Sequence, residues 1–292
     1  MSVKTYNYYN KRAYVVGDIH GHFDIIKNQI KTYKITDSVI IFAGDIGLGF
    51  EKTEHYKQIF PKLNKVMKTQ GNVLLFVRGN HDDPSYFQEE KINYSNIKSI
   101  PDYSVINFYQ DWDDEMKESP KFSILCVGGG ISIDRQYRLN AEEASVIEYK
   151  YWHPNASKKD IEEHRKRYYW SNELPFYDID KLDEITKEGY NIEYVVSHTA
   201  PDFCYPYTKK GIESWMQLDE NLEKDVDFER NTMTSIYNYL INHKHILTGW
   251  YYGHFHSHYE SYYDNVKFTL LDCEHHKWDM IEIGYKPMEI NI

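Results

Sequence analysis

The sequence is poor in cysteine and has no long apolar run. Its three cysteines, Cys126, Cys204 and Cys273, are far apart and odd in number, which argues against a disulfide framework and against a thiolate zinc cluster. We expect buried, reduced thiols. No apolar run approaches the roughly 20 residues of a membrane span, and the N-terminal residues are polar, without the apolar core of a signal peptide. We therefore expect a cytoplasmic protein that is not associated with a membrane.

Positive charge is also scarce. The chain has 34 Lys and Arg against 45 Asp and Glu, a formal net charge of −11. Because nucleic-acid binding normally relies on a basic surface, no stable binding to nucleic acid is expected. Histidine, by contrast, is abundant at 14 residues and clustered, with His254, His256 and His258 alternating along the chain. Such clustering favours metal binding.

The N-terminal third alternates short apolar runs with helical patterns. Strands are expected at 14–17, 38–43 and 72–77, and helices at 22–33 and 53–70. Thr53 is predicted to cap the second helix and Pro61 to kink it. The alternation implies parallel strands joined by right-handed crossovers, and ligands of such sheets bind at the carboxyl ends of the strands.

The rest of the chain predicts a second set of strands and one loose segment. Strands are expected at 103–109, 122–127, 192–196 and 245–251, a helical region at 212–243, and a hairpin at 258–263 and 266–271 turning at Asp264-Asn265. We interpret 1–292 as one domain with an insertion at about 134–189. Within it, Ser157 begins a predicted helix that leads into a basic, aromatic run at 158–170, either a lid over a site or a solvated helix face.

Polar clusters follow the strand-like runs. Residues two apart at the end of a strand can aim both side chains at one point, and a carboxylate and an imidazole held in this way suit a divalent metal. One such pair is a weak signal, but five occur in order. They are Asp18-x-His20, Gly44-Asp45, Gly79-Asn80-His81-Asp82, His198 and Gly253-His254-x-His256.

This series resembles the pattern of the calcineurin-like metallophosphoesterase superfamily: D-x-H, G-D, G-N-H-D/E, H and G-H-x-H. The resemblance spans residues 18–256. It implies an α/β fold, a β-sandwich flanked by helices in α/β/β/α layers, here with an inserted helical and aromatic segment. It also implies an enzyme, a metal-dependent phosphoesterase that hydrolyses phosphomonoesters or phosphodiesters with a hydroxide held between two metal ions.

The resemblance assigns seven metal ligands. By resemblance, Asp45 bridges two divalent ions, and the remaining ligands are Asp18, His20 and His256 at the first site and Asn80, His198 and His254 at the second. The two carboxylates neutralise only part of the charge of two divalent cations, so the site stays positive. It can therefore bind phosphate despite the acidic surface. Mn²⁺ is the expected metal, and Fe, Zn, Co or Ni fit the same ligands.

Two further residues of the motifs receive catalytic roles from the resemblance. His81 is left uncoordinated and protonates the leaving oxygen or orients the substrate, the alternative being a structural histidine. Arg78 precedes Gly-Asn-His, as in serine/threonine protein phosphatases and their diadenosine-tetraphosphatase relatives, where it contacts phosphate. The alternative is a surface arginine. Ile46-Gly47-Leu48-Gly49 follows Asp45 where the protein phosphatases have Val-Asp-Arg-Gly, which argues against protein phosphatase activity.

The run Gly128 to Arg138 resembles a stretch of many bacterial and phage members of the superfamily. Its glycines could bring Arg135 or Arg138 to the mouth of the site as phosphate-binding residues, or these arginines could pair with nearby carboxylates. A phosphorylated small molecule or nucleotide is the expected substrate rather than a protein. Alternative functions are a nucleotide or dinucleotide-polyphosphate hydrolase, a serine/threonine protein phosphatase, and a metal-bound scaffold that docks a protein and needs no catalytic histidine.

Overall fold

Two β-sheets pack face to face in the computed structural model, which describes residues 2–110, 119–165, 169–273 and 277–284. The seven strands of the first sheet are, in order, β1 (Thr5–Tyr9), β6 (Ser104–Tyr109), β7 (Phe122–Val127), β8 (Ile192–Ser197), β9 (Gly249–Tyr252), β11 (Val266–Leu270) and β10 (Tyr259–Tyr263). The five of the second are β12 (Met280–Ile283), β2 (Arg12–Val16), β3 (Ser38–Phe42), β4 (Val73–Phe76) and β5 (Ile97–Ser99).

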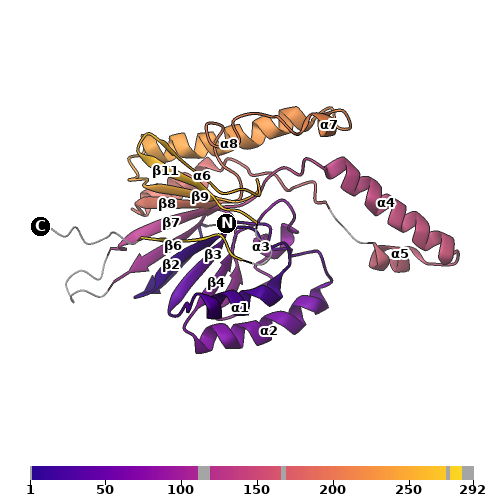
Figure 1. Ribbon diagram of the computed structural model, residues 1–292, viewed down its shortest axis with the longest axis horizontal. Helices are drawn as coiled ribbons and strands as arrows, with labels where there is room; N and C mark the ends of the chain where they lie inside the picture. The colour runs from indigo at the N-terminus through magenta and orange to yellow at the C-terminus, as the bar shows by residue number, and fades with distance from the viewer. Residues whose placement is uncertain (1, 111–118, 166–168, 274–276, 285–292) are drawn as a thin grey trace, which may run out of the picture.

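Helices cover the outer face of each sheet (Figure 1). The five-stranded sheet packs against α1 (Phe23–Thr32), α2 (Thr53–Thr69) and the short α3 (Ser85–Gln88). The seven-stranded sheet packs against α6 (Ile179–Lys187) and α8 (Leu222–Asn242). The short α7 (Glu213–Met216) precedes α8. The resulting α/β/β/α layers confirm the fold class predicted from the sequence.

The central strands are buried on both faces. Along β3, Val39 and Ile41 enter the core between the two sheets, whereas Ile40 and Phe42 pack against the helices. Because neither face meets water, the strand reads as an unbroken apolar run rather than an alternating one. β2, β3, β4 and β5 are parallel, as are β7, β8, β9 and β11. Their carboxyl ends therefore meet at one edge of the sandwich.

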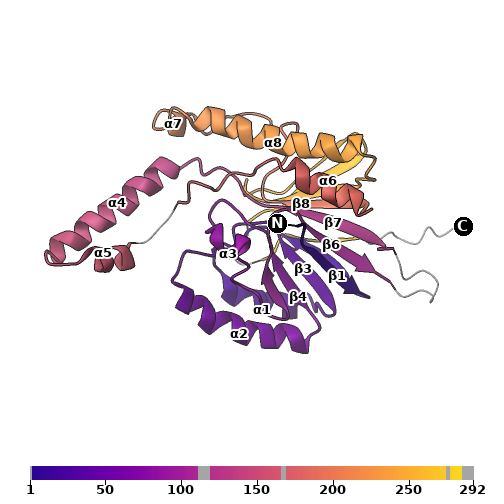
Figure 2. The same ribbon diagram turned by 180° about the vertical axis from the view of Figure 1, so that it is seen from behind.

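Part of the predicted insertion projects from this body as an arm. It consists of α4 (Arg135–Trp152) and α5 (Lys158–His164), which extend away from both sheets (Figure 2). The predicted helix start at Ser157 is confirmed, since its hydroxyl accepts from the Asp160 amide and the Asp160 carboxylate accepts from the Ser157 amide. In contrast, α6 packs Leu182 and Ile185 into the core of the body. The projecting part is thus shorter than the predicted insertion.

Several element boundaries differ from the sequence prediction. β1, β5 and β12 were missed, because edge strands of three to five residues carry little periodic signal. The helical region 212–243 is broken between α7 and α8, and the strand expected from residue 245 begins only at Gly249. The cap prediction at Thr53 was wrong: Lys52 holds the cap position without a side-chain bond, and α2 continues through Pro61.

The cysteines of the structure are free. Cys126 and Cys204 are buried as expected, whereas Cys273 is only half-buried. In the part of the chain that the structure describes, no helix is both long and apolar enough to cross a membrane.

The predicted hairpin is confirmed, with β10 and β11 paired antiparallel around Asp264-Asn265. Both turn residues have positive φ, 47° and 65°, as a two-residue type I′ turn requires. We expect Asn265→Val to lower the free energy of unfolding by about 1–2 kcal/mol, because a β-branched residue tolerates this backbone region poorly. Asn265→Gly should cause a smaller change. Urea denaturation measures both, and equal losses would show that the asparagine side chain matters rather than its backbone.

Candidate metal centre

Loops after β2, β3, β4, β8 and β9 bring the seven predicted metal ligands together at the edge where the parallel strands end. Four of these residues follow strands of the five-stranded sheet: Asp18, His20, Asp45 and Asn80. The other three follow strands of the seven-stranded sheet: His198, His254 and His256. The site therefore straddles the two sheets.

The first group of ligands converges on one point. Asp18, His20, Asp45 and His256 each offer a ligand atom, and these atoms all lie within 4.8 Å of one another. The Nε2 atoms of His20 and His256 are 3.1 Å apart, and Nε2 of His256 is 3.4 Å from Asp18 Oδ2. Two imidazoles and two carboxylates are a donor set that divalent transition metals bind.

The second group places three acceptor atoms in contact. His198 Nδ1 lies 2.8 Å from the Ala43 carbonyl and donates to it, so in the neutral ring Nε2 carries a lone pair. That atom faces Asn80 Oδ1 at 2.8 Å and Asp45 Oδ1 at 3.3 Å. Acceptors this close need a cation between them, either a proton or a metal ion. These residues therefore fit a metal.

The surroundings of His198 favour a positive charge at this ring. Burial alone would lower the pKa of this imidazole, but the carboxylates of Asp45 and Asp18 outweigh burial and raise it to about 10. The fully buried His254 lies beside it, with ring centres 4.8 Å apart. Burial and His198 hold the pKa of His254 well below its usual range, which leaves this ring neutral and able to ligate.

The backbone is strained at several of these residues. His20, Asp45, His254 and His256 have positive φ values of 43°, 47°, 73° and 45°. Side-chain-bearing residues adopt this region rarely and keep it only where the surrounding structure holds them there. Asp82, the last residue of the Gly-Asn-His-Asp motif, fixes the backbone of the loop after β3 through hydrogen bonds. Its buried carboxylate accepts from four backbone amides, those of Ile46, Gly47, Leu48 and Gly79.

A chain of hydrogen bonds orients Asn80. Its Nδ2 donates to Ser132 Oγ at 2.9 Å, and that hydroxyl donates to Glu173 Oε2 at 2.6 Å. Because the amide nitrogen is held on this side, Oδ1 is turned toward the metal centre. Burial raises the pKa of Glu173 to about 8. Sequence reasoning missed Glu173, since nothing local links it to a motif more than 90 positions away.

His81 lies at the open side of the centre. Its Nε2 is 3.7 Å from Asp45 Oδ2 and 3.4 Å from Arg138 Nη2, and its side chain is 17% exposed. Burial is the main cause that lowers the pKa of His81 to about 4. The ring lines a cavity of about 630 Å³ together with Asn80, His254 and His256.

The sequence between residues 11 and 257 matches the model of the family described as calcineurin-like phosphoesterase. The chain belongs to this family. The protein is accordingly a metal-dependent phosphoester hydrolase, and the family implies a dinuclear centre of divalent ions.

Solved structures similar to this phosphoesterase include a dimetal phosphatase from Danio rerio, at 10% identity and a TM-score of 0.45, covering 90% of this chain and 87% of the other. A phosphopantetheinyl hydrolase from Mycobacterium tuberculosis has 12% identity and a TM-score of 0.34, covering 98% and 100%. A cold-active protein-tyrosine phosphatase of a psychrophilic Shewanella has 11% identity and a TM-score of 0.33, covering 92% and 73%. No curated protein matches the chain.

Arg78 of this phosphoesterase does not face the metal centre. Its guanidinium is buried, pairs with Asp102 at 3.0 Å, and donates to the backbone carbonyls of Asn172, Glu173 and Leu174. Because the N–H groups of Arg78 point at these partners, they are not available to bind a phosphate. The contacts argue against the predicted phosphate contact and give Arg78 a structural role.

The two arginines of the run after β7 differ in their surroundings. Arg135 pairs with Asp219 at 2.5 Å and Asp225 at 2.7 Å, which ties α4 to the start of α8. Arg138 pairs with Asp134 at 2.7 Å and lines the cavity beside His81. Of this pair, Arg138 alone lines the cavity.

Proposed function

We propose that this phosphoesterase hydrolyses phosphate monoesters or diesters at a two-metal centre, with His81 acting on the leaving oxygen. The observation that carries the proposal is the convergence of Asp18, His20 and His256 on one side of Asp45 and of His198 on the other. One further imidazole, His81, lies between Asp45 and the cavity. When bound, two divalent ions polarise a phosphoryl oxygen and supply a nucleophilic water at neutral pH.

Asp45 is the residue we place between the two ions. Its Oδ1 lies 3.3 Å from His198 Nε2 and its Oδ2 lies 3.9 Å from His20 Nε2, so each oxygen faces one group of ligands. We assign Asp18, His20 and His256 to the first ion and Asn80, His198 and His254 to the second. Mn²⁺ is our reference metal because carboxylate, amide and imidazole ligands accept it, as they accept Fe, Zn, Co and Ni.

His81 is suited to hold or deliver a proton at the leaving oxygen. Its backbone amide donates to Asp45 Oδ1 at 2.8 Å, which holds this residue beside the proposed metal ligands. The lowered pKa of His81 favours the neutral ring when the cavity holds no anion. A phosphate dianion in the cavity would raise its pKa, since a nearby negative charge favours the protonated form.

The cavity walls favour a small phosphorylated molecule as substrate. Beyond the metal ligands and Arg138, the walls are formed mainly by residues 202–230, with Tyr205, Tyr207 and Trp215 among them. Aromatic side chains on a wall beside a phosphate site suit a flat leaving group. This favours the second candidate function, a nucleotide or dinucleotide-polyphosphate hydrolase, over action on a folded protein.

The predicted role of the basic, aromatic run 158–170 as a lid has no support in the described structure. Among the described residues that line the cavity, none lies between positions 139 and 201. Trp170 is buried close to Gly49 and Asp83, and residues 166–168 lie outside the described part of the chain. We therefore assign substrate choice to residues 202–230 and Arg138.

The test is metal-dependent turnover. Metal-depleted protein is reloaded separately with Mn²⁺, Fe²⁺, Zn²⁺, Co²⁺ or Ni²⁺ and assayed against an aryl phosphate, mononucleotides, cyclic nucleotides, dinucleotide polyphosphates, a phosphopeptide and nucleic acid. Hydrolysis that Asp45→Asn abolishes supports the proposal, because the variant keeps the size of the side chain and removes its charge. Metal binding without turnover of any substrate would favour a docking scaffold instead.

Arg138→Ala is expected to raise KM roughly 10- to 100-fold with a smaller change in kcat. A charge-assisted hydrogen bond made in both the ground and the transition state contributes about 1.5–3 kcal/mol to binding. Steady-state kinetics on the best substrate measures the effect. Arg165→Ala is the matched control, since Arg165 pairs with Glu142 on the arm at 3.1 Å, away from the cavity. An unchanged KM in Arg138→Ala would place phosphate recognition elsewhere.

A further inference from the structure

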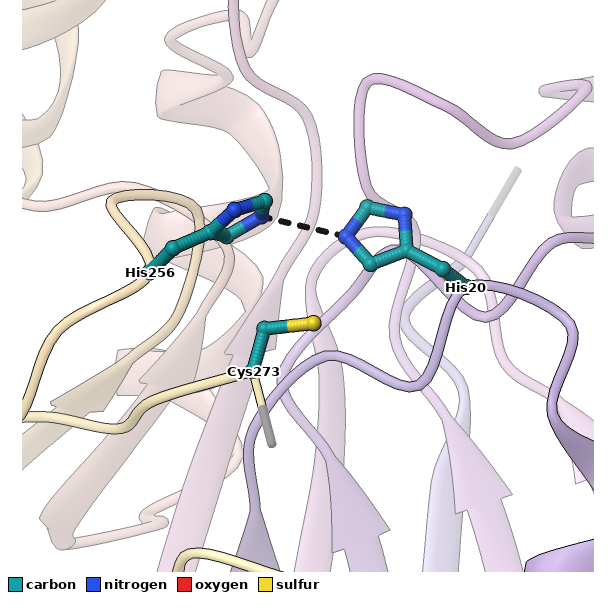
Figure 3. Close-up of side chains that lie close together, drawn as sticks. All are labelled: His20, His256 and Cys273. Atoms are coloured by element: carbon teal, nitrogen blue, oxygen red, sulfur yellow. Dashed lines mark hydrogen bonds between the residues drawn. The ribbon is translucent and has the colours of Figure 1, made fainter. Parts of the chain in front are cut away.

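Cys273 lies beside the first group of metal ligands. Its sulfur and the ligating nitrogens of His20 and His256 are all within 4.8 Å of one another. Figure 3 shows the three side chains reaching the same space from three separate loops, with the sulfur pointing into the region below the two rings. The sequence predicted Cys273 to be a buried, reduced thiol, because three widely spaced cysteines argue against a thiolate zinc cluster.

The segment that carries Cys273 is held against the end of β2. The Asp272 amide donates to Asp279 Oδ2 at 2.8 Å, and the same carboxylate pairs with His258 at 2.6 Å. Gly17 permits the close approach, since a Cβ at this position would lie only 2.4 Å from the Asp272 carbonyl oxygen. The position of the sulfur is therefore set by backbone packing as well as by the cysteine side chain itself.

We propose that Cys273 is a sulfur ligand of the metal ion in the first site, together with His20 and His256. The inference rests on the two-metal centre proposed above. The sulfur groups with the two imidazoles and with neither Asp18 nor Asp45, so it would take the place of a carboxylate oxygen around the first ion. A thiolate is a soft donor that favours Zn²⁺ or Fe²⁺ over Mn²⁺. On binding, the thiol releases its proton to solvent and the sulfur lone pair is donated to the ion. The first site is thereby selective for a softer metal, whereas the second keeps only oxygen and nitrogen donors.

X-ray absorption spectroscopy of the zinc-loaded full-length protein tests the assignment. With both sites filled, the spectrum should contain about one sulfur for every two zinc ions, at about 2.3 Å. Cys273→Ser should lose this sulfur and keep the nitrogen and oxygen neighbours. Cys204→Ala is the matched control, because Cys204 is buried in the core below the seven-stranded sheet, and it should retain the sulfur.

A competition titration supplies a second readout. Cys273→Ser should weaken Zn²⁺ binding at one site at least tenfold while leaving Mn²⁺ binding nearly unchanged, so the preference for zinc falls. Zinc bound in the parent protein with no sulfur neighbour, or an unaltered preference in the variant, would overturn the inference and leave the phosphoesterase centre standing. Failure of the parent protein to bind any metal would overturn both.

Discussion

His81→Ala is expected to slow turnover by roughly 10²- to 10⁴-fold, the usual contribution of a general acid, and to leave the metal content unchanged. The imidazole lies 3.7 Å from the Asp45 carboxylate yet stands on the cavity side of the metal ligands. Its loss therefore removes a proton donor without removing a ligand. Turnover of an aryl phosphate and elemental analysis of the same preparation measure the two quantities.

The choice of leaving group sharpens this experiment. A general acid matters less when the leaving oxygen is already a stable anion, so the loss in His81→Ala should shrink for a nitrophenyl ester and grow for an alkyl ester. His153→Ala is the matched control, since His153 is exposed at the end of α4. Loss of metal together with activity would make His81 a ligand or a structural residue.

Arg78→Met is expected to lower the free energy of unfolding by about 3–5 kcal/mol, the usual loss when one partner of a buried ion pair is removed. The variant removes the guanidinium that pairs with the Asp102 carboxylate and donates to three backbone carbonyls. Urea denaturation of the metal-free protein measures the loss. A phosphate-contacting arginine would behave differently: the variant would keep its stability and show a raised KM.

A double variant separates the ion pair from the rest of the site. Arg78→Met combined with Asp102→Leu removes both charges, so it should be less destabilised than the sum of the two single variants. Additive losses would mean that the guanidinium acts mainly through the carbonyls of residues 172–174.

The sequence motifs predicted which polar side chains gather at the ends of the strands. They did not predict the residues that hold those side chains in place. The proximity of Asp18, Asp45 and His198 could be predicted because each lies within three residues of the end of a buried strand, whereas their assignment as ligands came from the family resemblance. Glu173 and Asp102 could not, because their contacts with Ser132 and Arg78 join segments that are distant in the chain. Burial of Arg78 depends on that packing, and no local pattern distinguishes a buried arginine from one that meets a phosphate.

The cavity was harder still to anticipate. The basic, aromatic run at 158–170 has the composition of a substrate-binding segment, whereas most of the wall residues come from 202–230, a stretch with mixed charge and no motif. The sequence also could not separate the roles of two nearby arginines. Arg135 and Arg138 are three positions apart, yet Arg135 pairs with acidic residues near the start of α8 and Arg138 lines the cavity.

The proposed ligands are divided between the two sheets, so bound metal ions would cross-link the sandwich. Asp18, His20, Asp45 and Asn80 belong to one half and His198, His254 and His256 to the other, so sliding of the halves would pull each ion away from part of its donors. Ions that bind only the assembled sandwich stabilise it. At a free metal concentration of 100 times Kd, each site adds about 2.7 kcal/mol to the free energy of unfolding. Thermal unfolding should therefore shift upward with metal concentration, and chelation should loosen the two halves before it disturbs either one.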